Sequence, residues 1–401
     1  YPVACVDDLD PNIPTRVQLL GEQLCVWKDG EDKWQVFSDR CPHRWAPLSE
    51  GRIDLETKEL QCSYHGWSFD SNGSCTSIPQ VRTLTLNCYR ACATVFPAQV
   101  KQTLLWVWAD VSPEGLAACS ESSGPTVMPE LEHTAKGDKF EGCWYTRDMP
   151  YGFDTLIENL GDPSHLPHAH HGVVGKRSGA RPLQITLDQS KGYTTNLFSM
   201  SAPFDDAPNA ELSFKPPCLL YYKSDYTEGM SKLRDIIVPP LLRPLISLCL
   251  RLEKPEAMTS LTKPPEPNFT NIFAGYAVPT SPYHCRLILC NARNFFKWSV
   301  HMVWQKLTFA NRVKKHLSQH RVLDGDNILL HREELEMARG IPEGKGSLDR
   351  AFYMPTAADV PARAFRSWLQ DAGLPRWRGG VDTEVPQPLF DRVKLLDRSL
   401  R

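Results

Sequence analysis

Two short Cys–His motifs, separated by eighteen residues, constrain this chain more than any other feature of its sequence. The first motif contains Cys41 and His43, and the second contains Cys62 and His65. This is the ligand set of a Rieske [2Fe–2S] cluster, in which two Cys hold one iron and two His hold the other. A Cys2His2 zinc site uses the same ligands, but zinc fingers usually join Cys with Cys and His with His. Because each motif here is mixed, the spacing favours the Rieske cluster over zinc.

The length of 401 residues exceeds the usual size of one domain, so two domains are expected. Residues 1–111 contain short strand-like runs and turns, including a hairpin around Asp29, and predict a small antiparallel β domain that holds the cluster. Between residues 112 and 129 the composition changes to Ser, Gly, Pro and Glu, which indicates a linker. We therefore predict a cluster domain at 1–115 and a second domain at 116–401.

The second domain combines strand-like and helical patterns. Apolar runs of strand length occur at Ile272–Val278 and Arg286–Leu289. Helical periodicity extends over Trp298–His320, Leu323–Met337 and Asp359–Asp371. The block from residue 202 to 268 is rich in Pro and charge, and we expect it to be irregular.

Charge and cysteine content limit the class of protein. The net charge is −2 and the pI is near 6.7, without a long basic run, which argues against a nucleic-acid partner. Thirteen Cys are present, but their spacing does not resemble a secreted disulfide framework. Apart from Cys41 and Cys62, we expect mainly buried free thiols and a reducing environment.

Targeting and membrane segments are not evident in the sequence. The chain starts at Tyr1 without Met, so we expect that a targeting segment has been removed. The longest apolar run, Ile236–Leu252, is interrupted by three Pro and by Arg. Because a bilayer span needs about 20 mostly apolar residues, this run does not predict one. It fits a segment at a membrane surface or a Pro-broken segment packed on the core.

A second group of possible metal ligands lies at residues 162–171, where four His and one Asp occur within ten residues. Two imidazoles and one carboxylate, with open positions for O2, form the facial triad of non-haem Fe(II) oxygenases. In a regular helix, residues three apart diverge by about 60° and residues five apart by about 140°, which favours His165 with His168. Pro167 disrupts a regular helix, and a distorted turn would bring His165 and His170 together. Spacing alone therefore leaves the second His open.

The carboxylate of such a triad must come from another part of the chain. Residues 322–330 contain Asp324 and Asp326 at the apparent start of an apolar helical segment. Asp is favoured at a helix start, and capping is the better interpretation for Asp324. For Asp326 we favour metal ligation.

Longer stretches of the sequence resemble a known family. They are Cys41–Asp54, Gln61–Phe69, Gly73–Gln80, Arg90–Ala93, Asp162–His171, Asn291–Phe296, Asp324–Asp326 and Ala364–Leu369. They are similar to the Rieske non-haem iron oxygenases that include pheophorbide a oxygenase, chlorophyllide a oxygenase and the translocon-associated phyllobilin hydroxylase. Rieske subunits of electron-transfer complexes carry a further Cys in each loop, whereas this chain has Ala46 and Tyr64 there. The cluster thus resembles the kind that supplies an oxygenase.

The resemblance implies an α+β fold, in which an antiparallel β Rieske domain precedes a catalytic domain with a curved antiparallel sheet and helices, of helix-grip type. It also implies a set of cofactor ligands. These are Cys41, His43, Cys62 and His65 for the [2Fe–2S] cluster, and His165, His170 and Asp326 for mononuclear Fe(II). Asp162 would link a cluster His of a neighbouring subunit to an iron His. Asn159 would orient the same network, or only cap the backbone.

The implied activity is the opening of pheophorbide a by O2, with electrons from reduced ferredoxin, to give red chlorophyll catabolite in chlorophyll breakdown. The implied enzyme is a homotrimer in the chloroplast, at the thylakoid or envelope membrane. Relatives have a C-terminal Cys-x-x-Cys and hydrophobic segments that attach them to the membrane, and we expect this chain, which ends at Arg401, to be the portion before them. The alternatives are a hydroxylase of another chlorophyll-derived tetrapyrrole or phyllobilin, and a redox-sensing electron-transfer subunit.

A flat, apolar macrocycle requires a large and mostly apolar pocket with a few polar groups. Phe295, Phe296, Trp298 and Trp304 are candidates for its walls, and Arg293 is a candidate partner for a propionate. A plain core or surface position is the alternative for each of them.

Overall fold

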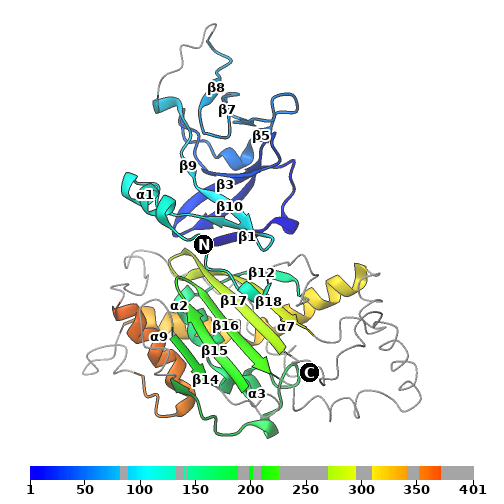
Figure 1. The fold of residues 1–401 in the computed structure, drawn as a ribbon, viewed down its shortest axis with the longest axis vertical. Helices are drawn as coiled ribbons and strands as arrows, with labels where there is room; N and C mark the ends of the chain where they lie inside the picture. The colour runs from blue at the N-terminus through cyan, green and yellow to red at the C-terminus, as the bar shows by residue number, and fades with distance from the viewer. Residues whose placement is uncertain are drawn as a thin grey trace, which may run out of the picture.

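The computed structural model describes residues 1–81, 89–131, 140, 142–187, 198–201, 209–225, 270–294, 309–340 and 352–371. A β-rich N-terminal part lies at one end of the molecule, and a larger part built on one extended sheet lies at the other (Figure 1). The N-terminus lies at the junction of the two parts, where the Tyr1 ammonium group donates to the Val107 carbonyl at 2.9 Å.

The N-terminal part contains three small antiparallel sheets. The first has the order β1-β11-β10, from β1 (Pro2–Cys5), β10 (Ala98–Lys101) and β11 (Leu104–Val107). The second has the order β2-β3-β4-β9, from β2 (Thr15–Leu19), β3 (Glu22–Lys28), β4 (Trp34–Ser38) and β9 (Val95–Phe96). The third has the order β5-β6-β7-β8, from β5 (Arg52–Ile53), β6 (Leu60–Gln61), β7 (Ser68–Phe69) and β8 (Cys75–Ser77). The predicted hairpin around Asp29 is confirmed as β3 and β4.

Short helical turns connect some of these strands, namely η1 (Val6–Asp8), η2 (Leu48–Glu50) and η3 (Tyr89–Ala91), and η4 (Pro129–Leu131) lies between this part and the next. The predicted linker at 112–129 is wrong in its first half, which forms helix α1 (Pro113–Glu121). The Ser112 hydroxyl caps this helix by accepting the Gly115 N–H at 3.0 Å, and Pro113 provides a favourable first helical residue. The composition indicated a flexible linker here, but Ser112 followed by Pro113 is a stronger signal for the start of a helix. The predicted division at 115/116 falls inside α1 and stays a prediction.

A seven-stranded antiparallel sheet forms the second part, in the order β12-β18-β17-β16-β15-β14-β13. Its strands are β12 (Trp144–Met149), β13 (Thr186–Leu187), β14 (Phe198–Ser201), β15 (Asn209–Lys215), β16 (Leu219–Asp225), β17 (Thr270–Ser281) and β18 (His284–Arg293). The predicted strands at Ile272–Val278 and Arg286–Leu289 are confirmed as parts of β17 and β18.

The expectation of an irregular block at 202–268 is wrong for its described part, residues 209–225, which forms β15 and β16. Ala210, Leu212 and Phe214 alternate along β15 and are buried, so the period-two pattern of a strand was present in the sequence. Neighbouring Pro and charged residues dominated the composition and concealed that pattern. Residues 202–208 and 226–269 lie outside the described residues.

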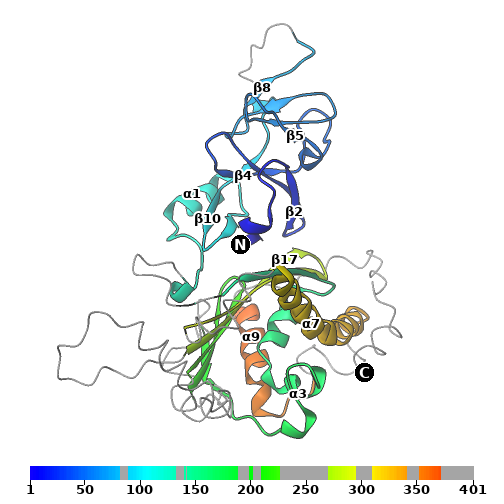
Figure 2. The same cartoon turned by 90° about the vertical axis from the view of Figure 1, so that its right-hand side faces the viewer.

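Helices cover one face of this sheet, and Figure 2 shows α7 and α9 on the same side of it. The helical elements are α2 (Phe153–Leu160), η5 (Pro163–His165), α3 (Leu166–Ala169), η6 (Arg177–Gly179), α7 (Phe309–Ala338), η9 (Ala357–Asp359) and α9 (Val360–Asp371). The helices predicted at Leu323–Met337 and Asp359–Asp371 are confirmed, and the start of the third, 298–308, lies outside the described residues. Among the helices that the structure describes, none combines the length and apolar character needed to cross a bilayer. The α+β fold class is confirmed.

Among the described thiols other than Cys41 and Cys62, Cys5, Cys25, Cys75, Cys218, Cys285 and Cys290 are buried, Cys119 is half-buried, and Cys92 and Cys143 are exposed. The apolar run Ile236–Leu252 lies outside the described residues.

Aromatic packing and one ion pair fix α9 against α2 and the sheet. Phe214 of β15 lies 4.8 Å from the Trp368 ring and 5.2 Å from the Phe365 ring, measured between centroids. The Arg366 guanidinium donates to both carboxylate oxygens of Glu158, with Nε to Oε1 at 2.9 Å. Both side chains are largely buried, at 7% and 13% exposed. Since Glu158 lies in the last turn of α2, this pair fixes the helix that leads into residues 162–171.

Replacing Arg366 by Met should lower the free energy of unfolding by about 3–5 kcal/mol, because it leaves the buried Glu158 carboxylate without its bidentate partner. Urea unfolding would measure the change. Arg339→Met is the matched control, since the Arg339–Glu336 pair is 67% exposed on each side and should contribute less than about 1 kcal/mol. Equal changes in the two variants would contradict a structural role for the buried pair.

Candidate metal centres

The two Cys–His motifs of the N-terminal part form two equivalent turns. In the first, the Cys41 N–H donates to the Ala46 carbonyl at 2.8 Å. In the second, the Cys62 N–H donates to the Trp67 carbonyl, five residues later again, at 2.9 Å. The fifth residue of each turn has a left-handed backbone, and this residue is Trp45 in one turn and Gly66 in the other. The same backbone geometry therefore presents both pairs of ligands.

The thiols lie on the inner side of these turns. Cys41 and Cys62 are each 2% exposed and belong to one apolar core with Trp27, Phe37 and Phe69. Burial raises the pKa of the Cys41 thiol to about 12, and the neighbouring Cys62 adds to the rise. The buried Cys41 thiol therefore favours its protonated form. Bound metal would favour the thiolate form, as thiolate ligation requires.

The imidazoles lie on the outer side. The His43 and His65 rings are 4.4 Å apart between centroids, and His43 also stacks on Trp67 at 4.7 Å with an interplanar angle of 5°. His43 is exposed and His65 is half-buried. The turns thus bring together two buried sulfur atoms and two accessible imidazoles, which fits a cluster with two Cys on one iron and two His on the other.

The segment after α2 is not a regular helix. Asp162 caps η5, because its Oδ1 accepts the Ser164 N–H at 2.7 Å, and Pro163 and Pro167 each occupy an early position of a short helical turn. The distortion separates η5 from α3 and rotates His168 outward, where it is exposed. The Nε2 atoms of His165 and His170 lie 3.1 Å apart. Spacing left two pairs open, His165 with His168 and His165 with His170. The structure brings together His165 and His170, the pair that requires the distorted turn.

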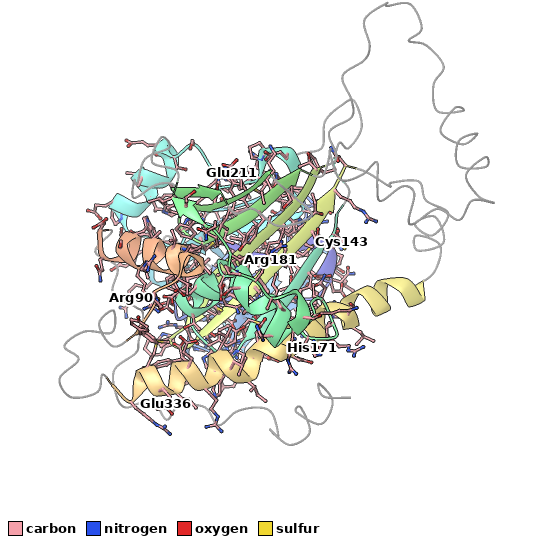
Figure 3. The ribbon with its side chains drawn as sticks, turned by 90° about the horizontal axis from the view of Figure 1, so that it is seen from below. Arg90, Cys143, His171, Arg181, Glu211 and Glu336 are labelled. Atoms are coloured by element: carbon pink, nitrogen blue, oxygen red, sulfur yellow. The ribbon has the colours of Figure 1, made fainter. Side chains whose placement is uncertain are left out.

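His171, the fourth His of this segment, is exposed and is labelled in Figure 3. Its Nδ1 accepts the Arg177 N–H at 3.2 Å. It does not belong to the group formed by His165 and His170.

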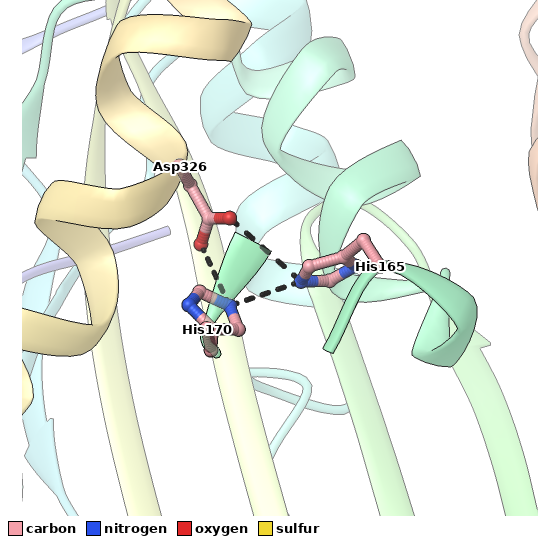
Figure 4. Close-up of side chains that lie close together, drawn as sticks. All are labelled: His165, His170 and Asp326. Atoms are coloured by element: carbon pink, nitrogen blue, oxygen red, sulfur yellow. Dashed lines mark hydrogen bonds and ion pairs between the residues drawn. The ribbon is translucent and has the colours of Figure 1, made fainter. Parts of the chain in front are cut away.

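Asp326 of α7 completes a compact group of ligand atoms with His165 and His170 (Figure 4). Its Oδ2 lies 3.3 Å from His170 Nε2, and its Oδ1 lies 3.8 Å from His165 Nε2. Two ligand atoms that each lie about 2.1 Å from an ion, at right angles to each other, are about 3 Å apart. The distances here are close to that value, so one ion fits between these atoms. His170 is 2% and Asp326 3% exposed, whereas the His165 side chain is 20% exposed. The group is open on the His165 side.

The expected helix cap at Asp324 is wrong, because α7 starts at Phe309 and Asp324 lies in its middle. Residues two apart on a helix point about 160° away from each other, so Asp324 faces away from the ligand group. Its Oδ1 is paired at 2.5 Å with Arg147, whose guanidinium also donates to the His320 carbonyl at 3.1 Å. Because Arg147 lies in β12, the ion pair of Asp324 with Arg147 fixes α7 to that strand.

Gly325 allows α7 to approach the His170 turn. A Cβ atom at this position would lie 2.9 Å from the Ala169 carbonyl oxygen and 3.3 Å from His170 Nδ1. In an ordinary helix interior, Gly→Ala is stabilising by about 1 kcal/mol. Here the contact with backbone opposes that gain, because α7 would have to move away from the ligand group.

Gly325→Ala should weaken metal binding by the His165, His170 and Asp326 group about tenfold, because it separates Asp326 from His170. Iron retention against a competing chelator would measure this. Gly179→Ala is the matched control, since a Cβ there meets nothing within 4 Å. A Gly325→Ala protein that is more stable and binds iron as before would contradict the close approach.

Asp162 lies beside the ligand group without belonging to it. Its Oδ2 is 3.8 Å from His165 Nδ1, which is beyond hydrogen-bonding distance. Burial opposes the charge on each group, but the close approach of the two groups outweighs it, together with the Ser164 donors to Asp162 and the Asp326 charge near His165. The pKa of Asp162 is therefore lowered and the pKa of His165 is raised. Asn159 accepts the Asp162 N–H through its carbonyl at 3.1 Å, which is the backbone-capping alternative. A role of the Asn159 side chain stays a prediction.

The predicted substrate residues are mostly beyond the described part of the chain. Phe295, Phe296, Trp298 and Trp304 lie outside the described residues. Arg293 is half-buried at the end of β18, opposite Asn271 of β17. Its proposed contact with a propionate stays a prediction.

Three residues around the ligand group were missed in the sequence. Glu158 and Arg366 are separated by 208 positions, and no local pattern joins them. Gly325 carried a detectable signal, because a Gly between two Asp in a helical segment opposes helix propensity and indicates a close approach of backbone.

Comparisons with protein families give two matches. Residues 1–90 match the Rieske [2Fe-2S] domain, and residues 214–343, which include Asp326, match pheophorbide a oxygenase. Chloroplastic pheophorbide a oxygenases from Oryza sativa subsp. japonica and Arabidopsis thaliana are 35% and 36% identical over 99% of this chain and 69% of their own length. A chloroplastic flavonoid 8-hydroxylase 2 from Ocimum basilicum is 34% identical over 99% of this chain and 70% of its length.

Solved structures support the same fold. Apo dicamba monooxygenase has a TM-score of 0.62 at 14% identity and covers 93% of this chain and 97% of its own. NdmA of Pseudomonas putida CBB5 with caffeine has a TM-score of 0.60 at 19% identity and covers 92% of this chain and 89% of its own. At such low identity, these two structures bear on the fold alone.

Proposed function

The chain belongs to the Rieske non-haem iron oxygenase family that contains pheophorbide a oxygenase, and from this premise we propose that it opens the macrocycle of pheophorbide a with O2. The product would be red chlorophyll catabolite, in chlorophyll breakdown. The observation that carries the proposal is the identity of 35% and 36% to two pheophorbide a oxygenases over 99% of the chain. Family membership also confirms the two predicted cofactors, a Rieske [2Fe–2S] cluster and a mononuclear non-haem iron.

We assign the cluster to Cys41, His43, Cys62 and His65, and the mononuclear iron to His165, His170 and Asp326. The cluster would supply electrons one at a time, and the iron would activate O2 next to the substrate. The mutual distances of 3.1 to 3.8 Å among the iron-ligand atoms support this assignment. Three protein ligands on one side leave room on the other for O2 and substrate.

The protein groups around these ligands hold them in place. Buried thiols keep one side of the cluster dry, and the accessible His43 and His65 face outward, where electrons enter and leave. Asp162 would fix the orientation of His165 from behind and connect the two centres, as carboxylates behind metal-bound His do. The proposed connection crosses a subunit interface in a homotrimer, with Asn159 as a further orienting group.

The proposed partners and location are those that the resemblance to the family implies. We propose reduced ferredoxin as electron donor and the chloroplast as compartment, since the similar relatives are named chloroplastic. Attachment at the thylakoid or envelope membrane belongs to the same proposal. We also propose that residues 1–115 form the Rieske domain and residues 116–401 the catalytic domain, with the boundary inside α1.

A second candidate is hydroxylation of another substrate. The flavonoid 8-hydroxylase 2 of Ocimum basilicum is 34% identical, nearly as similar as the pheophorbide a oxygenases, so the shared metal centres support either reaction. Hydroxylation of another tetrapyrrole or a phyllobilin falls in the same class. A redox-sensing subunit without oxygenase activity is less favoured, because the His165, His170 and Asp326 group is complete.

Product analysis under labelled O2 tests the proposal. The iron-loaded protein would receive reduced ferredoxin, pheophorbide a and 18O2, and mass spectrometry would identify the product. A ring-opened product with labelled oxygen is expected. A hydroxylated and intact macrocycle, or unchanged pheophorbide with both metal centres occupied, would contradict ring opening and favour the second candidate.

A further inference from the structure

Helix α7 buries polar side chains where an ordinary packed helix would bury apolar ones. Beyond Asp326, the buried face of α7 contains Asn327, His331 and Glu334, which are 1%, 6% and 4% exposed. These three positions follow the four- and three-residue spacing of one helix face, so the polar stripe is continuous. Burying polar groups is unfavourable unless they form hydrogen bonds, so this stripe needs partners.

Several of these groups have no hydrogen-bond partner among the described residues. They are both side-chain polar atoms of Asn327, the Nε2 atom of His331 and the hydroxyl of Tyr151. Tyr151 is 0% exposed. His331 Nδ1 lies 2.8 Å from the Pro150 carbonyl, which can only accept, so in the neutral ring Nδ1 carries the proton and Nε2 is a bare acceptor. Four buried polar atoms of three side chains are thus without a hydrogen-bond partner among the described residues.

The backbone places these side chains near one another and near Asp326 of the proposed iron site. Pro150, which binds His331, precedes Tyr151 directly, and Asn327 is one turn before His331 on the same face of α7. Asn327 follows Asp326 in the chain. Burial raises the pKa of Tyr151 most, and the charges of Cys285 and Asp326 raise it further, so Asp326 acts on this hydroxyl. From Asp326 to His331 the rise along the helix is only about 7.5 Å.

The far end of the stripe carries a hydrogen-bonded carboxylate. The Thr155 hydroxyl of α2 donates to Glu334 Oε2, and Thr155 is 4% exposed. Glu334 is one turn beyond His331, so an acid, an imidazole and an amide follow one another toward the iron ligands. Such an order of groups suits transfer of protons more than support of the fold, because apolar side chains would fill the same space at lower cost.

We propose that Asn327, His331 and Tyr151 hold ordered water and form a buried proton path to the mononuclear iron site. The inference rests on the proposed oxygenase function. Two-electron reduction of O2 takes up two protons (O2 + 2e⁻ + 2H⁺ gives the H2O2 oxidation level), and the electrons come from the Rieske cluster. The carboxylic acid form of Glu334, which takes its proton from solvent, gives that proton through water to His331 Nε2. The ring becomes imidazolium while Nδ1 keeps its bond to Pro150. Nε2 then returns a proton to the water on the Asn327 side, so the path is reset.

A crystal structure of the iron-loaded protein tests the first half of the inference without substrate. Ordered water within hydrogen-bonding distance of His331 Nε2, the Tyr151 hydroxyl and the Asn327 amide is expected. Direct bonds among the three side chains, or a dry cavity, would overturn the proposal. Because no turnover is measured, this result is independent of whether pheophorbide a is the substrate.

Variants test the second half. His331→Leu removes the acceptor, and Tyr151→Phe removes one hydroxyl and keeps the ring if His331→Leu does not fold. We expect the iron content and the spectrum of the reduced cluster to be unchanged. The amount of product formed per O2 consumed should fall at least about tenfold, and the release of peroxide should rise. The solvent isotope effect on turnover should also change. Arg332→Gln, at the exposed next position of α7, is the matched control and should behave as the parent. Loss of iron in the variants, or full coupling, would overturn a role in proton transfer.

Discussion

Replacing Asp326 by Ala should abolish oxygenation and lower the iron content from about three atoms per chain to about two. The Asp326 carboxylate is the single anionic group among the three proposed iron ligands, and its oxygens lie 3.3 and 3.8 Å from the His170 and His165 nitrogens. Without it, two imidazoles would bind Fe(II) weakly. Since residues that only orient metal ligands already contribute 10–100-fold to affinity or activity, we expect turnover to fall by more than about 100-fold.

Metal analysis together with the spectrum of the reduced cluster would separate the two centres in this variant. The cluster signal should be unchanged, because its ligands lie in the N-terminal turns. Asp324→Ala is the matched control, since its carboxylate is on the same helix but binds Arg147. That control should keep all its iron and lose only some stability. Iron loss in Asp324→Ala, or a third iron retained in Asp326→Ala, would contradict the ligand assignment.

The cluster turns could be predicted from sequence because their ligands are local. Each Cys and its His are two or three residues apart in one turn, so spacing reports the geometry directly. The proposed iron site could be predicted only in part. Its two His depend on how Pro163 and Pro167 divide the segment into η5 and α3, and periodicity describes regular helices only. The resemblance to the family, rather than spacing, indicated His170 instead of His168.

The sequence patterns could not predict the roles of residues whose positions depend on long-range packing. The interpretation of Asp324 as a cap failed because the start of α7 could not be located from its apolar pattern, and a 30-residue helix placed both Asp in its interior. Glu158 and Arg366 meet only because α2 and α9 cover the same face of the sheet. For β15 the period-two signal was present, but weighting composition above alternation gave an irregular segment.

Replacing Asp162 by Asn should leave all three irons bound and lower coupled turnover by about 10–100-fold. Asp162 is not one of the three grouped ligands, and its Oδ2 faces His165 Nδ1 at 3.8 Å. Its Oδ1 is held by the Ser164 N–H, so the carboxylate has a fixed direction. Asn keeps the size of the side chain but removes the charge that supports the proton on His165 Nδ1. The orientation of His165 and the proposed connection to the cluster would weaken, while the iron ligands stay in place.

Single-turnover measurements would locate the defect. With the cluster reduced beforehand and substrate present, oxidation of the cluster on mixing with O2 should be slowed in Asp162→Asn, while iron content stays unchanged. Ser164→Ala is the graded control, because it removes the hydroxyl that donates to Oδ1 and keeps the backbone N–H, so its effect should be below about tenfold. Unchanged cluster oxidation in Asp162→Asn would contradict a role in connecting the centres. Loss of the mononuclear iron would instead show that Asp162 acts by holding His165 in its binding position.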